Sequence, residues 1–345
     1  MKSCSEAKLI TRVLRSAGEF RDIASDCRDL FLHCPHATPF QHPAWLLGWM
    51  EVFEPRQLVG IEVREGSRLL GFAPLLIYPR AEERVLAFAG GGVSDYLGLL
   101  AEPGREVEVL DDVLSAAESI PDWDVLDLTD LPGGSALLAY EALMQGRRQH
   151  DVCFVLPLPE TQDELLHTFS TRQRANLRNA RSRTQREGGG GTIELAQTDT
   201  LQEFLDDLFR LHGRRWNEAG ETGVLSDERV IQFHRAVAPE LFSAGILRLY
   251  RMRVNGRSIA AIYALFHRGT VFCYLQGYDP EFSHLSPGTQ LMFAVMEDAV
   301  RLGMRRFDFL RGEEAYKMHW RPRGELTYRI EAPRADLAKQ FRPAA

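Results

Sequence analysis

The sequence predicts an α/β fold made of two tandem units, each a mixed β-sheet flanked by helices. Two observations carry this prediction. The chain has 345 residues, which is enough for two domains of ordinary size. One order of elements also occurs twice along it: a β-hairpin, a further strand, an amphipathic helix and a closing strand. The recurrence indicates two copies of one unit.

The first copy begins with a hairpin over 58–77, where two strand-like runs flank a tight turn. A third strand follows over 84–91, then an amphipathic helix over 105–120 and a closing strand within 123–134. Because the helix crosses over between two strands, these two are expected to pair in parallel. A further helix is expected near 41–53, before the hairpin.

The second copy repeats this order from a hairpin over 247–266, which turns at Asn255-Gly256, a strong two-residue hairpin signal. Two prolines interrupt a strand-like run near 155–160, so the predicted domains are residues 1–156 and 157–345. The other expected elements of this half are helices over 161–187 and 199–219, a strand over 270–277, a helix over 288–303 and a closing strand over 305–314.

Composition argues against several classes of function. No apolar run approaches the roughly 20 residues of a membrane-spanning helix, and the charged N-terminal stretch lacks the apolar core of a signal peptide. A net charge of −7 argues against DNA binding. Five scattered cysteines, never in a CxxC pair, favour a reducing compartment, so we expect a cytoplasmic protein.

One stretch of the first copy is rich in possible metal ligands: His33, Cys34, His36 and His42. Their spacing fits no tight zinc pattern and no second cluster completes it, so no metal site is expected. Cys273 falls in a predicted buried strand, where we interpret it as a structural thiol.

An arginine-rich segment, TRQRANLRNARSRTQRE (171–187), is unusual in this acidic chain, because it holds six arginines and one acid. Arg174, Arg178 and Arg181 recur at helical spacing and are expected to share a face. Such a face is either a solvated basic surface or a phosphate-binding one, since guanidinium groups match phosphate geometry.

The segment HLSPGTQLMF (284–293) predicts a helix start that suits an anion. Ser286 suits the N-cap, Pro287 the first helical position, and Gly288 lets a ligand approach the backbone. Unpaired N–H groups at such a start bind phosphate well, although an ordinary cap has the same sequence. In the first copy, Glu102 and Glu106 lie beside the corresponding loop and would repel a pyrophosphate, so no cofactor is expected there.

The order of elements in the second copy resembles the core of the GNAT acyltransferase superfamily. This order is a hairpin, a strand, a loop suited to phosphate, a helix and a strand. More narrowly, the chain resembles the CelD-like acetyltransferases associated with cellulose and exopolysaccharide biosynthesis. These are similar in turn to the Fem-type aminoacyl transferases, which carry two GNAT units in tandem. The resemblance covers nearly the whole chain, and its segments are 38–53, 94–100, 170–183, 286–303 and 307–320.

The resemblance implies an acyl-CoA-dependent transferase whose C-terminal half keeps the cofactor site. The implied residues for acetyl-CoA or another acyl-CoA are Gln276, Ser286, Pro287, Gly288, Thr289 and Gln290. The usual superfamily loop is Gln/Arg-x-x-Gly-x-Gly/Ala, and this chain departs from it with HLSPGT. The departure leaves open whether the donor is acetyl-CoA, a longer acyl-CoA, an acyl carrier protein or an aminoacyl-tRNA.

The stretch FDFLRGEEAYKMHW (307–320) ends a strand in a dense polar and aromatic cluster. The resemblance favours Glu313, Tyr316 and Lys317 for catalysis, and strand alternation adds Asp308 as a candidate base. Tyr316 either protonates a leaving thiolate or stacks on a ligand, and Lys317 would neutralise a phosphate or an oxyanion. Strand-end charges are also commonly just solvated.

Asp95 and Tyr96, at the corresponding edge of the first copy, are predicted to bind the acceptor together with Arg174, Arg178 and Arg181. The predicted function is direct transfer of an acetyl or other acyl group from acyl-CoA to an amine or hydroxyl of a small-molecule acceptor. One alternative is a Fem-like aminoacyl-tRNA-dependent transferase, the only case in which tRNA is an expected partner. The other is a non-catalytic scaffold in exopolysaccharide assembly.

Overall fold

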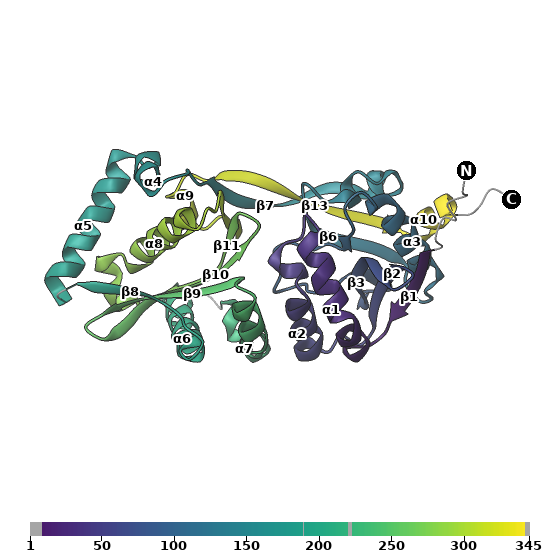
Figure 1. Cartoon of the computed structure of the whole chain (residues 1–345), viewed down its shortest axis with the longest axis horizontal. Helices are drawn as coiled ribbons and strands as arrows, with labels where there is room; N and C mark the ends of the chain where they lie inside the picture. The colour runs from purple at the N-terminus through teal and green to yellow at the C-terminus, as the bar shows by residue number, and fades with distance from the viewer. Residues whose placement is uncertain (1–8, 189, 220–222, 342–345) are drawn as a thin grey trace. The chain divides into compact units, whose positions relative to one another are not determined.

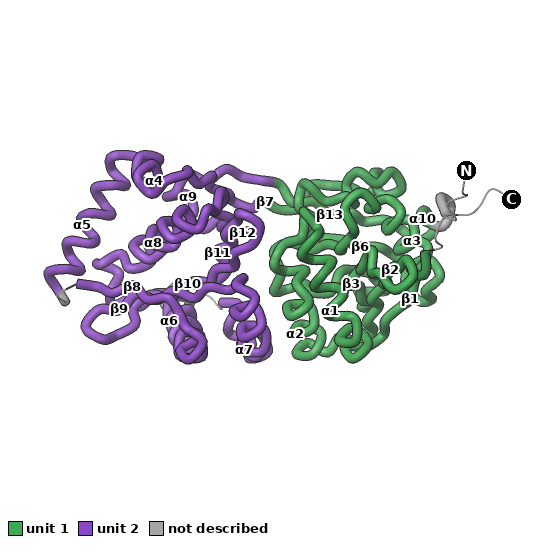
Figure 2. The backbone as a smooth tube through the Cα atoms, viewed as in Figure 1, with its two compact units in different colours: residues 1–152, 326–345 green, residues 153–325 purple. Residues whose placement is uncertain are grey.

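The computed structural model describes residues 9–188, 190–219 and 223–341. The chain divides into two compact units, one made of residues 1–152 with 326–345 and the other of residues 153–325 (Figure 2). Each unit contains a mixed β-sheet with helices packed on it (Figure 1). The prediction of an α/β fold with mixed sheets is therefore confirmed, while the domain boundary at 156/157 stays a prediction.

In the first unit the strand order is β1-β2-β3-β4-β6-β13-β7, with the short β5 beside β3. The hairpin β2–β3 is antiparallel, and β4 pairs with β6 in parallel, as the crossover predicted. The elements are β1 (Leu9–Leu14), α1 (Ala17–His33), η1 (Pro39–Gln41), α2 (Pro43–Phe53), β2 (Leu58–Glu65), β3 (Arg68–Arg80), β4 (Glu83–Phe88), β5 (Leu100–Ala101), α3 (Glu106–Ser119), β6 (Val125–Pro132), η2 (Ala136–Leu138), η3 (Glu141–Gly146), β7 (Arg147–Pro157), β13 (Arg323–Pro333) and α10 (Arg334–Phe341).

In the second unit the strand order is β7-β12-β11-β10-β9-β8. The hairpin β9–β10 is antiparallel, and β11 pairs with β12 in parallel across the α8 crossover. The elements are α4 (Gln162–Thr168), α5 (Thr171–Gly188), β8 (Gly191–Leu195), α6 (Leu201–Ala219), η4 (Val224–Ser226), α7 (Glu228–Ser243), β9 (Leu247–Val254), β10 (Arg257–His267), β11 (Thr270–Tyr278), η5 (Pro280–Leu285), α8 (Pro287–Arg301), β12 (Arg306–Arg311) and α9 (Ala315–Met318).

Side-chain alternation along β10 explains why helices cover both faces of the second unit's sheet. Ile262 and Ala264 share one hydrophobic core with Leu291 of α8. Tyr263 lies between them in the chain and points the other way, with its ring 5.4 Å from the ring of His234 in α7. Because neighbouring side chains point to opposite faces, α8 and α7 cover opposite faces of the sheet. Burial of a large apolar side chain such as Ile262 or Leu291 contributes about 1.5–3 kcal/mol of transfer free energy.

The strand β13 brings the end of the chain back to the first unit. Ile330 lies opposite Leu128 of β6 in an antiparallel pair, and its side chain is part of the first unit's core. The described residues from 326 to 341 therefore group with the first unit. No local pattern shows which sheet edge a strand will join, so this return was not visible in the sequence.

Candidate functional site

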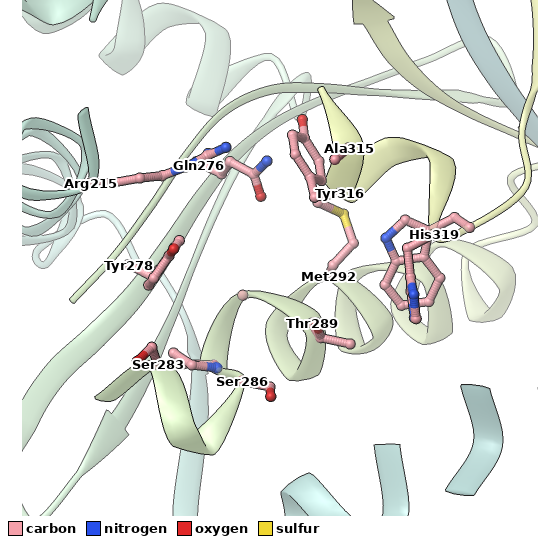
Figure 3. Close-up of a pocket in the computed structure, with 13 residues that line it drawn as sticks. Arg215, Gln276, Tyr278, Ser283, Ser286, Thr289, Met292, Ala315, Tyr316 and His319 are labelled. Carbon is pink, nitrogen blue, oxygen red and sulfur yellow. The ribbon is translucent and has the colours of Figure 1, made fainter. Parts of the chain in front are cut away.

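A cavity of about 430 Å³ opens in the second unit, where β11, α8 and α9 meet (Figure 3). Six of the predicted site residues line it: Gln276, Ser286, Pro287, Gly288, Thr289 and Tyr316. The loop before α8 and the polar cluster after β12, which the sequence analysis singled out, therefore face one cavity.

The floor of the cavity is the start of α8. Ser286 precedes the helix with left-handed backbone angles (φ 52°, ψ 51°), and within the described chain its side chain makes no capping hydrogen bond. Pro287 occupies the first helical position and has no N–H to satisfy. The N–H groups of Gly288 and Thr289 at the next two positions, with the positive end of the helix dipole, therefore form an anion-binding end.

Gly288 leaves space that the folded chain does not fill. An added Cβ would meet only the Tyr278 ring among the described residues, at 3.9 Å, and the backbone there is not left-handed. A glycine inside a helix costs about 1 kcal/mol relative to alanine, and neither packing nor backbone geometry calls for it here. Open space at a helix start suits the close approach of a phosphate, so the residues present fit the pyrophosphate of a CoA donor.

The arginine-rich helix α5 reaches this floor through Arg183. Its Nε donates to the carbonyl oxygen of His284 at 2.7 Å, and its Nη2 lies 3.5 Å from Ser286 Oγ. Arg181 lies elsewhere on α5, with its guanidinium 5.3 Å from the Phe293 ring centroid and 3.2 Å from a Glu297 oxygen. The arginine beside the floor is therefore Arg183, which the sequence did not single out.

Arg215 enters the cavity because α6 lies directly on β11. At Gly277 a Cβ would come within 2.3 Å of the backbone nitrogen of His212, so only glycine permits this approach. About one turn further along α6, the Arg215 Cζ lies 5.2 Å from the ring centroid of Tyr316 and 5.9 Å from that of Tyr278. Sequence reasoning missed Arg215, and its signal was a glycine inside a strand, which often marks a close backbone approach.

Tyr316 supplies a protonated hydroxyl to the cavity. Burial raises its pKa well above the usual value of 10, the charges of Cys273 and Glu314 raise it further, and Arg215 opposes them. The Tyr316 side chain also hydrogen-bonds to Gln276. The phenol is therefore protonated at neutral pH and is able to donate a proton. Burial also raises the pKa of Cys273 to about 12, so its thiol is not a nucleophile at neutral pH.

His319 and Trp320 form another wall of the cavity, and the first turn of α5 and the residues before it hold them in place. The carbonyl oxygen of His319 accepts a hydrogen bond from Gln173 Nε2, and the Trp320 ring lies edge-on to Phe169 at 5.3 Å. Burial lowers the pKa of His319, and the charge of Arg172 lowers it further. The imidazole is therefore neutral at pH 7 and is able to accept a proton.

Two predicted residues, Asp308 and Lys317, contact the backbone at the end of β12. Asp308 Oδ1 accepts the N–H of Leu310 at 2.8 Å. The Lys317 side chain is only 2% exposed, and its ammonium group donates to the carbonyl oxygens of Leu310 and Arg311. Neither residue is among the described ones that line the cavity.

Other predicted residues of the second unit also lie off the cavity lining. Gln290 is buried and donates to Thr184 Oγ1 at 2.9 Å and to the carbonyl oxygen of Leu285 at 2.8 Å, so it ties α8 to α5. Glu313 is exposed before α9, and Arg178 is exposed on α5. Arg174 makes a long contact of 3.4 Å with Thr171 on its own helix.

Asp95 and Tyr96 belong to the first unit. Tyr96 is buried, its ring lies 6.3 Å from that of Phe40, and its carbonyl oxygen accepts a hydrogen bond from Gln41 Nε2 at 2.9 Å. Their role in acceptor binding stays a prediction.

Among the residues that the structure describes, no group of three or more His, Cys, Asp or Glu side chains is placed to hold a metal ion. In the same part of the chain, no helix has both the length and the apolar character needed to cross a membrane. Cys4 lies outside the described residues, and the other cysteines are buried free thiols: Cys27, Cys34, Cys153 and Cys273.

Comparison with known families and structures agrees with this geometry. Residues 171–318 match the family described as an acetyltransferase (GNAT) domain. This range lies inside the second unit and includes α5, α8 and Tyr316. Over this range the second unit is thus similar to GNAT-type acetyltransferase domains. Comparison with curated protein sequences gives no significant match.

Several solved structures share the fold over most of the chain. FemX superposes with a TM-score of 0.65 at 13% identity, covering 92% of this chain and 98% of that one. The C-terminal domain of a putative lysylphosphatidylglycerol synthetase from Agrobacterium fabrum gives 0.57 at 12% identity, covering 94% and 96%. L-PGS from Bacillus licheniformis gives 0.50 at 15% identity, covering 75% and 80%. At these identities the likeness establishes the fold alone.

Proposed function

We propose that this protein is an acyltransferase that moves an acetyl or other acyl group from acyl-CoA to an amine or hydroxyl of a small acceptor. The observation that carries the proposal is one cavity that combines an uncapped helix start with a protonated tyrosine. The helix start binds the phosphates of the donor, and the tyrosine donates a proton to the leaving thiolate. The GNAT match over 171–318 supports the same reaction class.

The transfer balances without a covalent enzyme intermediate. The acceptor nitrogen attacks the thioester carbonyl carbon, a C–N bond forms, the C–S bond breaks, and the sulfur leaves as a thiolate. One proton leaves the nitrogen and one joins the sulfur, so no further reactant is consumed. For a hydroxyl acceptor, its oxygen takes the place of the nitrogen.

Each step has a residue in or beside the cavity. The N–H groups of Gly288 and Thr289, with Arg183 beside them, bind the donor phosphates. Tyr316 gives its phenolic proton to the thiolate, and Gln276 orients the hydroxyl. His319 accepts the proton that the acceptor loses, because its neutral imidazole lines the cavity and the Glu313 carboxylate does not.

Finer assignments extend this proposal. Acetyl-CoA is the simplest donor, and the CelD-like resemblance points to an acceptor in cellulose, exopolysaccharide or cell-envelope metabolism. We expect the enzyme in the cytoplasm, where unpaired thiols such as the four buried cysteines persist. The fold shared with FemX keeps a Fem-like aminoacyl-tRNA-dependent transferase as a second candidate. Against it, a net charge of −7 is poorly suited to a large polyanionic donor.

Isothermal titration with acetyl-CoA tests the proposal through two matched variants. Gly288 is the second residue of α8, and Gly18 is the second residue of α1. At both positions the helix dipole stabilises a carboxylate, so a glutamate is tolerated equally well. We expect Gly288→Glu to weaken acetyl-CoA binding by at least about tenfold, and Gly18→Glu to leave it unchanged. Equal weakening by both, or no binding by the wild-type chain, contradicts the proposal. Salt-dependent tRNA binding without CoA binding supports the Fem-like candidate. Absence of both CoA binding and tRNA binding supports the non-catalytic scaffold.

A further inference from the structure

The outer face of α5 carries arginines that no acid of the described chain neutralises. One side of this helix is buried, through Leu177 and Thr184, and packs on the second unit. The outward side holds Arg172, Arg178 and Arg186, which are exposed, and none of the three pairs with an Asp or Glu in the described part of the chain. Because the chain has a net charge of −7, this face is a local basic surface suited to an anionic partner.

The helix α5 borders the cavity of the second unit along its length. Near its start, Gln173 Nε2 donates to the carbonyl oxygen of His319, a residue that lines the cavity. Near its end, Arg183 Nε donates to the carbonyl oxygen of His284 at 2.7 Å, and Arg183 Nη2 lies 3.5 Å from Ser286 Oγ. Figure 1 shows α5 at an edge of this unit, beside α8. An α-helix is about 10 Å across, so a partner held on the outer face lies about that far from the cavity wall.

The chemistry of the outer face favours an acidic protein over a membrane or a nucleic acid. The other exposed side chains there include Asn176, Asn179 and Ser182, and no large apolar side chain is present to enter a lipid bilayer. Three arginines are few for a polynucleotide, which commonly engages about six to ten phosphate contacts. They suit a small group of carboxylates, which guanidinium groups bind in a bidentate manner. Glu187, the only acid of α5, is engaged with His284 at 2.8 Å.

We propose that the outer face of α5 docks an acidic carrier protein, which presents the acyl thioester on a phosphopantetheine arm. The inference rests on the proposed function, because the cavity beside α5 receives a thioester only if acyl transfer occurs there. The arm has the same thiol as CoA and one of its phosphates, so the helix start at Gly288 and the proton of Tyr316 serve both donors. The acceptor attacks the same carbonyl carbon, the C–S bond breaks, and the protonated sulfur stays on the carrier.

Isothermal titration of the full chain compares two donors: a type II acyl carrier protein loaded with an acetyl group, and acetyl-CoA. The test variant combines Arg172→Gln, Arg178→Gln and Arg186→Gln, which removes three charges and keeps the helix propensity. We expect it to bind the loaded carrier about tenfold less tightly, as three exposed ion pairs together provide, and acetyl-CoA as tightly as the wild-type chain. Carrier binding by the wild-type chain is expected to weaken from about 50 mM to about 300 mM salt, because exposed charges are screened.

The matched control combines Arg21→Gln, Arg229→Gln and Arg235→Gln. It removes the same charge from exposed helix positions, and each of these arginines pairs with an acid. The control is expected to keep the wild-type affinity for the loaded carrier. The inference is overturned if the wild-type chain binds acetyl-CoA but no carrier, if the α5 variant keeps full carrier binding, or if both variants weaken it equally.

Failure of the proposed function gives a different result. If the wild-type chain binds neither acetyl-CoA nor the loaded carrier, the proposed function fails and the inference fails with it. If the α5 variant loses acetyl-CoA to the same extent as the carrier, the arginines serve CoA, so the inference fails while the proposed function stands. Binding of tRNA or of phosphatidylglycerol vesicles through these arginines, without carrier binding, assigns the face to another polyanion and also overturns the inference.

Discussion

The buried ammonium group of Lys317 lies 3.4 Å from the carbonyl oxygen of Leu310. Leu310 has a φ of 62°, which is uncommon for leucine, and its N–H is bound by Asp308. The pairing of β12 with β7 shifts register between Asp308 and Arg311, so the strand is irregular at this point. Two ionisable side chains therefore stabilise the bend that leads from β12 to α9 and Tyr316.

This relationship predicts that Lys317→Met lowers the free energy of unfolding and has little direct effect on kcat. The variant leaves the buried carbonyl oxygen of Leu310 and the partly buried one of Arg311 without their donor, which costs about 2 kcal/mol in the free energy of unfolding. Glu314, whose oxygen lies 2.8 Å from the Lys317 Nζ, also loses its partner, and Glu314→Met added to the variant is expected to recover part of the loss. Urea denaturation measures the change. A hundredfold drop in kcat with unchanged stability would instead favour a catalytic role.

Gly277 is predicted to control how closely α6 approaches β11. A Cβ at this position would lie 2.3 Å from the His212 backbone nitrogen, so Gly277→Ala forces α6 away from the strand and costs about 2 kcal/mol or more. Because Arg215 follows on the same helix, its position against the Tyr278 and Tyr316 rings changes as well. Gly213→Ala is the control, since this α6 glycine has open space around its Cβ position and gains helix propensity. Similar stabilities for the two variants would contradict the prediction.

Tyr316→Phe is predicted to lower kcat by about a hundredfold, because proton transfer by a positioned side chain contributes that much or more. KM for acetyl-CoA should change little, since the ring remains in place. Because burial raises the pKa of Tyr316 well above 10, its proton is present throughout the neutral range, and deprotonation of this group should cause no loss of activity up to about pH 9. Tyr278→Phe, which alters another tyrosine in the lining of the same cavity, is the control. Equal losses in both variants would assign Tyr316 to packing.

The repeat made most of the fold predictable, because each copy carries its own local signals. The Asn255-Gly256 turn has positive φ at both residues (50° and 74°), as a two-residue hairpin requires. The crossover helices α3 and α8 join strands that pair in parallel. The helix expected over 161–187 is instead two, because Phe169 is extended and Ser170 caps the second, with its Oγ 3.3 Å from the Gln173 nitrogen.

The candidate site was predictable where its residues are close in the sequence. Ser286 to Thr289 and Tyr316 lie in two short segments whose composition differs from that of their counterparts in the first copy. Arg215 lies on a distant helix, and only the close approach at Gly277 brings it to the cavity. The contacts of Asp308 and Lys317 with Leu310 were also hidden, because leucine gives no signal of a left-handed backbone.

Two buried histidines predict how stability depends on pH. Burial lowers the pKa of His234 to about 3 and that of His212 to about 4, and the charge of Arg215 adds to the effect on His212. In the unfolded chain both imidazoles titrate near a pKa of about 6.5. Between these values the unfolded chain binds more protons than the folded one, so the free energy of unfolding falls as pH decreases from about 6.5 towards 4.

Each histidine accounts for about one proton, which lowers the free energy of unfolding by roughly 2 kcal/mol per histidine between pH 7 and pH 5. His234→Phe removes one of the two protons, so its stability is expected to fall less over this interval than that of the wild-type chain. Phe233→Leu is the control, because this buried neighbour has no proton to exchange, and its destabilisation should be the same at both pH values. Urea denaturation at pH 7 and pH 5 measures both. If His234→Phe keeps the full wild-type pH dependence, His234 must already be protonated in the folded chain at pH 5, which its burial among Phe233, Tyr263 and Tyr274 disfavours.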